Sequence, residues 1–112
     1  MNAAARALVG RTVELLVSRR FDELEQLSSG VRLRAEHIRD GVADYPGTLV
    51  TPPSVDEELD VLRIQGTDPP AWSVNCRLWT KEEGPSDLTL ELTVREHEDG
   101  SASVEIDGIR VL

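Results

Sequence analysis

The chain has 112 residues and a formal net charge of −9, which suits a single domain and argues against a nucleic-acid partner. Its one cysteine, Cys76, excludes an intramolecular disulfide, and no segment approaches the roughly 20 apolar residues that cross a bilayer. We therefore expect one domain over residues 1–112, in the cytoplasm and without membrane association. Residues 57–112 carry a net charge of −8, so a basic protein would associate faster than a neutral one.

The first half of the chain predicts helices. Residues 3–20 carry a broad apolar stripe at helical spacing, and Arg19 and Arg20 fall in the last predicted turn, where exposed carbonyls favour cations. A short second helix follows, because Asp22 stands three residues before Glu25, as in a capping box.

A third helix is predicted over residues 31–45, whose apolar residues recur on one helical face. The Pro46-Gly47 pair then ends it, since proline disfavours the helical conformation in the residue before it. Residues 51–58 contain two prolines and three acidic residues, and they are predicted to form a connector.

From Leu59 onward the apolar period changes from helical to two, which predicts strands. The predicted strands cover residues 60–64, 72–79, 88–95 and 102–106. A polar loop over residues 80–87 is expected between the second and third strands, and Asp99-Gly100 predicts a tight hairpin between the last two. The alternation slips at Asp107-Gly108, which indicates a β-bulge.

These elements predict an α+β fold, with three N-terminal helices packed on one face of a curved antiparallel sheet of about four strands. Leu90 and Leu92 belong to the buried side of this sheet, and Glu91 and Thr93 to the side that faces water. No internal repeat is present.

The polar side of the sheet is the predicted partner face, because Trp79 lies there among charges and Trp and Arg are enriched at interface centres. It comprises Asn75, Arg77, Trp79, Glu91, Thr93, Arg95 and Glu105. A partner protein or a second copy, forming a homodimer through the sheet, could occupy it. In the alternative interpretation, Trp79 folds over its own hairpin and buries its ring locally.

Signatures of catalysis are missing from the sequence. There is no phosphate-binding glycine loop, no cluster of zinc ligands and no local nucleophile motif, so we expect no catalytic residues, no metal and no cofactor. Cys76 belongs to the apolar alternation and is expected to be inert, and His97, among acidic neighbours at a hairpin, is expected to be solvated.

Two stretches resemble the cystatin-like, nuclear-transport-factor-2-like superfamily: VELLVSRRFDELEQLSS at residues 13–29 and LTLELTVREHEDGSASVEIDGIRVL at residues 88–112. The run from Trp79 to Leu88 is similar to small uncharacterised bacterial domains. The superfamily resemblance implies a sheet that wraps round the first helix, a pocket in some members and frequent dimerisation through the sheet. Its enzymes place an Asp-His or Asp-Tyr pair in the pocket, for which this chain offers His37, Tyr45 and Asp107.

The sequence favours a non-enzymatic binding or protein-interaction module, and an immunity-like role, in which an acidic domain blocks a basic enzyme, is one version of it. The alternative is a small-molecule binder or enzyme with a pocket between the first helix and the sheet, lined by His37, Tyr45 and Trp72. A structural subunit of a larger complex is a third hypothesis.

Overall fold

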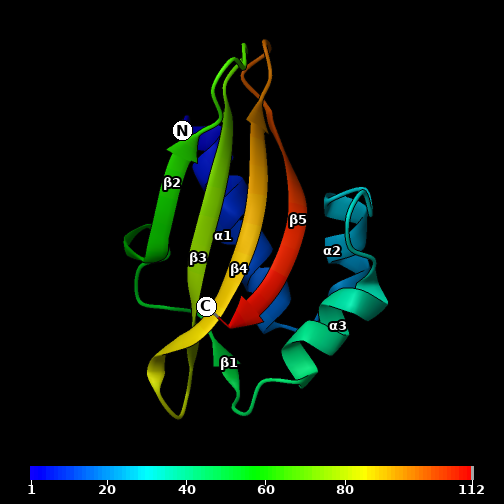
Figure 1. Cartoon of the computed structure of the whole chain (residues 1–112), viewed down its shortest axis with the longest axis vertical. Helices are drawn as coiled ribbons and strands as arrows, with labels where there is room; N and C mark the ends of the chain where they lie inside the picture. Colours follow the sequence, from blue (N-terminus) through cyan, green and yellow to red (C-terminus); the bar gives the residue numbers. More distant parts are fainter. Residues whose placement is uncertain (112) are drawn as a thin grey trace.

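The computed structural model describes residues 1–111, which form three α-helices followed by a five-stranded antiparallel sheet (Figure 1). This arrangement confirms the α+β fold class. The helices are α1 (Ala3–Val17), α2 (Phe21–Leu27) and α3 (Ala35–Ala43). The strands are β1 (Leu49–Val50), β2 (Leu59–Arg63), β3 (Ala71–Thr80), β4 (Gly84–Glu96) and β5 (Ala102–Val111), and Asp56–Glu58 form one 3-10 turn before β2.

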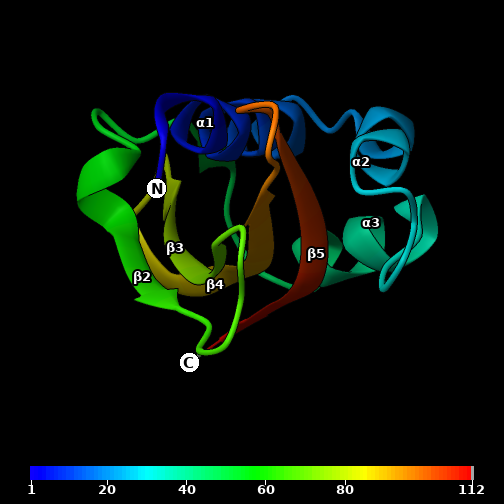
Figure 2. The same ribbon diagram turned by 90° about the horizontal axis from the view of Figure 1, so that it is seen from above.

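The sheet curves round α1, which lies against its concave face, while α2 and α3 lie beside β5 (Figure 2). The space between α1 and the sheet is filled by apolar side chains that are at most 3% exposed. They include Val9, Val13 and Leu16 from α1 and Leu90, Leu92, Val94, Val104 and Ile106 from the strands. Within residues 1–111, no helix covers the convex face, which is turned toward the viewer in Figure 1.

The strands follow the order β1-β3-β4-β5, and β2 pairs with β3 on the same side as β1. The predicted alternation is confirmed, because Leu90 and Leu92 are buried while Glu91 and Thr93 are only half-buried. The period-two pattern therefore assigned the concave and convex faces of the late strands correctly.

The β-bulge expected at Asp107-Gly108 is confirmed. Glu91 pairs with Gly108 and Leu92 with Ile106, so Asp107 is the extra residue. Its carboxylate accepts a hydrogen bond of 2.7 Å from the Thr93 hydroxyl, and this bond holds the bulged residue against β4.

A polar loop does join β3 and β4 as a hairpin, but the expected range of residues 80–87 is too long, because β4 begins at Gly84 and pairs with β3 from Thr80 onward. The pairing is irregular after Arg77, and the Ser86 hydroxyl supplies bonds there by donating to the Leu78 carbonyl at 2.7 Å. The same hydroxyl oxygen accepts from the Leu88 N–H at 3.2 Å. A buried side chain thus completes the backbone pairing that the sequence pattern could not predict.

The first helix ends earlier than predicted, at Val17. Arg19 adopts a left-handed backbone with φ of +59°, and the Arg20 N–H donates to the Leu15 carbonyl at 2.9 Å, as in a Schellman motif. Arg19 and Arg20 therefore lie beyond the last turn of α1 and not within it.

The predicted capping box at Asp22 and Glu25 is also wrong, since the N-cap of α2 is Arg20 and has no side-chain cap. The Glu25 carboxylate instead accepts a hydrogen bond of 2.9 Å from the Ala35 N–H. This bond caps α3, which begins at Ala35 and ends at Ala43, inside the predicted range of residues 31–45.

Candidate functional site

The convex face of the sheet divides into two halves of different character. On the β4–β5 half, the Arg110 guanidinium makes two contacts of 2.7 Å with the Glu91 carboxylate, and this bond raises the pKa of Arg110. The pair stands across the bulge, where the carboxylate lies close above Gly108: an added Cβ there would be 2.8 Å from Glu91 Oε1. Gly108 thereby leaves room for the ion pair.

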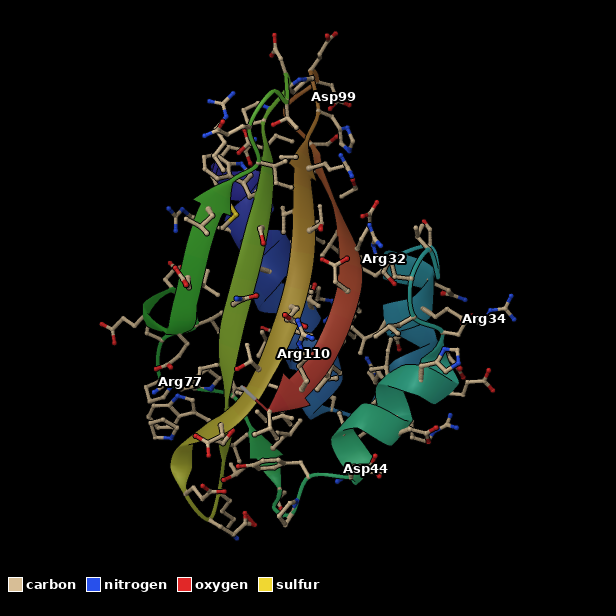
Figure 3. All side chains as sticks on the ribbon, viewed as in Figure 1. Arg32, Arg34, Asp44, Arg77, Asp99 and Arg110 are labelled. Atoms are coloured by element: carbon tan, nitrogen blue, oxygen red, sulfur yellow. The ribbon has the colours of Figure 1, made fainter. Side chains whose placement is uncertain are left out.

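A second group of charges on this half is also paired within the chain. Arg95 lies 3.5 Å from Glu105, and Arg32, which reaches over from the α2–α3 connection, lies 2.9 Å from Asp107 (Figure 3). With the Thr93–Asp107 bond, these contacts engage four of the seven residues of the predicted partner face: Glu91, Thr93, Arg95 and Glu105. Arg32 was not predicted, because its connection to the sheet depends on tertiary packing.

The β2–β3 half presents side chains without such partners. Among residues 1–111, the side chains of Asn75 and Arg77 make no hydrogen bond or ion pair, and neither does Asp60, which stands opposite Asn75 on β2. Leu62 is 66% exposed on the neighbouring position of the same face. This half therefore offers unpaired polar groups and an exposed apolar side chain side by side.

A hollow of about 180 Å³ indents this half of the convex face. Glu58, Asp60, Asn75, Arg77 and Thr89 line it. Two carboxylates at the β2 side and one guanidinium at the β3 side give it a polar rim, so it suits a charged side chain better than an apolar ligand.

Trp79 lies at the C-terminal end of β3, where it pairs with Val50 of β1 and Pro85 of β4. Its ring packs over Gly84 of its own hairpin, since an added Cβ at Gly84 would lie 3.8 Å from the ring. The ring is half-buried, and its indole N–H is buried without a hydrogen-bond partner among residues 1–111. The local packing agrees with the alternative interpretation of Trp79.

The three residues predicted to line a pocket lie in separate places. The Tyr45 hydroxyl donates to Glu83 at 3.0 Å, and Tyr45 borders a hollow of about 170 Å³ between α3 and β5 that neither His37 nor Trp72 lines. The Trp72 indole donates to Glu96 at 2.8 Å. These contacts do not bring the three side chains into one site.

His37 is exposed on α3, where its Nδ1 accepts from the Arg34 N–H at 3.3 Å. Asp107, the acidic member of the pair implied by the resemblance, lies on the convex face with Arg32. Neither an Asp-His nor an Asp-Tyr pair is therefore formed by His37, Tyr45 and Asp107.

The remaining candidates for chemistry are a thiol and an imidazole. Burial, and secondarily the charge of Glu58, raises the pKa of the Cys76 thiol to about 12. His97 is exposed, and its Nε2 lies 2.9 Å from the Ser103 hydroxyl. Within residues 1–111, no group of three or more His, Cys, Asp or Glu side chains is placed to hold a metal ion.

A family model described as a domain of unknown function, DUF7668, matches residues 13–112. Neither a curated protein nor a solved structure matches the chain. The resemblance to the cystatin-like, nuclear-transport-factor-2-like superfamily therefore stays a prediction. In the part of the chain that the structure describes, no helix has the length and apolar character needed to span a membrane.

Proposed function

Since the chain belongs to the DUF7668 family of unknown function, we propose its function from its own surface: it is a non-enzymatic protein-interaction module. One observation carries the proposal. The β2–β3 half of the convex face is uncovered and presents Asn75, Arg77 and Leu62 without partners among residues 1–111, whereas the β4–β5 half pairs its charges internally. A partner on the first half therefore has no existing ion pair to displace.

Net charge supports a basic partner protein. The chain carries −9 overall, and −8 of this falls in residues 57–112, which contain β2 to β5. A field of this sign accelerates association with a positively charged surface and slows association with a second copy. A cytoplasmic, immunity-like role, in which the domain blocks a basic enzyme, is one version of this proposal.

Two other hypotheses receive less support from the geometry. The hollow beside Tyr45, at about 170 Å³, is smaller than the roughly 300–1,000 Å³ of most ligand sites, and the space between α1 and the sheet is filled by the core. A homodimer through the sheet would place two chains of charge −9 against each other.

The test is affinity capture at low ionic strength from a native extract of the source organism, with three immobilised proteins compared. They are the wild type, Asp60→Lys and Glu98→Lys. Asp60 is exposed and unpaired among residues 1–111, so its reversal repels a basic partner from the candidate surface without breaking a contact of the fold. Glu98→Lys is the matched control, because Glu98 is exposed between β4 and β5, makes no ion pair among residues 1–111 and undergoes the same charge change outside the β2–β3 half.

We expect at least one protein to be retained by the wild type and by Glu98→Lys and to be lost with Asp60→Lys. Circular dichroism should show that all three proteins are folded. If the same proteins are retained by all three, the β2–β3 half does not bind them and the proposal is wrong.

A further inference from the structure

The two edges of the sheet differ in their protection. The β5 edge is flanked by α3, whose Gly41 approaches Ile109 so closely that an added Cβ would lie 3.3 Å from the Ile109 Cβ. The β2 edge has no neighbour, because among residues 1–111 strand β2 pairs only with β3 (Figure 1). Such an edge presents backbone groups that can pair with another strand.

The register shows which backbone groups of β2 point outward. The Ile64 N–H donates to the Ala71 carbonyl at 2.9 Å, and Arg63 stands opposite Trp72. Because hydrogen bonding alternates along an antiparallel pair, Asp60 and Leu62 also bond toward β3. The N–H and C=O groups of Val61 and Arg63 consequently face the open edge.

The side chains of β2 do little to block this edge. The strand contains no proline or lysine, and Leu62 is 66% exposed on its convex side. Asp60 stands beside it and forms, with Glu58, the β2 side of the hollow of about 180 Å³. In the part of the chain that the structure describes, neither carboxylate has an ion-pair partner, whereas the nearby Asp56 lies 3.5 Å from Arg6.

We propose that β2 accepts an extended segment of a partner protein as an added strand, with Lys or Arg opposite Asp60 and an apolar side chain against Leu62. The backbone bonds to Val61 and Arg63 hold the segment, and the basic side chain reaches the β2 side of the hollow, where Glu58 and Asp60 lie. Two carboxylates against the one guanidinium of Arg77 give the hollow a net negative charge. This inference rests on the proposed function and specifies how its partner is bound.

A second copy fits this edge less well. In a two-fold dimer of β2 edges, one register places Leu62 opposite its own copy and aligns the outward backbone groups of Val61 and Arg63. This register puts Ile64 of one chain opposite Asp60 of the other. An apolar side chain would then face the Asp60 carboxylate in both chains. A basic segment is complementary where a second copy is not.

The probe is a phage-displayed library of random segments of about ten residues, selected against the full chain. Selected segments are then synthesised and their affinities are measured for the wild type, Arg63→Pro, Arg63→Ala and Asp60→Lys. Proline removes the outward N–H of Arg63 and is tolerated at a strand edge. Arg63→Ala is the matched control, because it removes the same side chain and keeps that N–H.

We expect the selected segments to alternate apolar residues with Lys or Arg. Their affinity should fall roughly tenfold with Arg63→Pro and with Asp60→Lys, and change little with Arg63→Ala. Equal affinities for Arg63→Pro and Arg63→Ala overturn strand addition. A library that yields no binding segment, or segments without basic residues, also overturns the inference, as does a homodimer in sedimentation that Arg63→Pro dissociates.

The failure of the proposed function gives a different result. A cellular partner that is lost with Asp60→Lys but retained by Arg63→Pro leaves the interaction module standing and rejects strand addition alone. Retention of every captured protein by both variants rejects the module.

Discussion

Cysteine is a reactive residue type, but the burial of Cys76 is expected to make its thiol unreactive. It lies fully buried in the middle of β3, and burial raises its pKa from 9.0 to about 12. Since the thiolate is the nucleophile, the folded protein should resist thiol reagents at mildly alkaline pH and react once it is unfolded. The measurement is the rate of labelling with a chromogenic disulfide reagent, with and without denaturant. Rapid labelling of the native protein would contradict the burial of this thiol.

At the residue scale, the sequence predicted which side of the sheet a residue occupies but not whether its charge is paired. Period two depends only on neighbours along the chain, so it placed Glu91 and Arg95 correctly on the polar side. Their partners, Arg110 and Glu105, come from another strand and depend on the register across the β5 bulge. The division of the face into paired and unpaired halves was therefore beyond sequence reasoning.

The chain leaves helix α1 through a residue with a left-handed backbone, two positions after the last helical residue, and this leads to a prediction at the element scale. Arg19 holds a left-handed backbone with φ of +59°, a conformation that costs most side chains energy and costs glycine little. Arg19→Gly should raise the free energy of unfolding by about 0.5–1 kcal/mol. Chemical denaturation measures this change. Arg20→Gly is the control, because φ of Arg20 is −91°, and an equal gain there would show that the effect does not come from the left-handed conformation.

Helices and strands whose apolar pattern continues over many residues could be predicted from the sequence. Elements that form only through contacts with distant parts of the chain could not. Strands β3 and β5 follow the alternation that the sequence displays. Strand β1 has only two residues and exists because Leu49 and Val50 pair with the end of β3. The start of β4 depends in the same way on the hydrogen bond from the Ser86 hydroxyl to the Leu78 carbonyl, which the local sequence pattern does not predict.

The whole molecule is elongated, 40 Å in its longest extent, and carboxylates bind backbone N–H groups near both ends. A hydrogen bond from the Thr48 N–H lowers the pKa of Glu82, and one from the Asn2 N–H lowers the pKa of Glu96. A lowered pKa in the folded state means that protonation favours unfolding. The stabilisation is complete above the ordinary value of 4.5 and is lost as the pH falls through the lowered values.

We therefore expect the melting temperature to fall as the pH drops below 4.5, and Glu82→Gln to weaken this dependence. Glu57→Gln is the matched control, since Glu57 is exposed in the 3-10 turn and lies away from the two ends at which Glu82 and Glu96 bind backbone N–H groups. Calorimetry over a pH series measures the effect. An identical pH dependence for the wild type and Glu82→Gln would contradict the role assigned to this carboxylate.

One edge of the sheet is flanked by α3 and the other, β2, has no neighbour among residues 1–111, and this asymmetry limits the assemblies that the protein can form. A filament grows strand by strand only if every subunit has two sheet edges that can pair, because each added subunit must offer a free edge to the next. Here α3 flanks β5 at Ile109, and Arg32 of the α2–α3 connection lies against Asp107. We therefore expect the addition of a strand at β2 to end after one segment, so that a higher concentration of segment fills β2 without forming fibres.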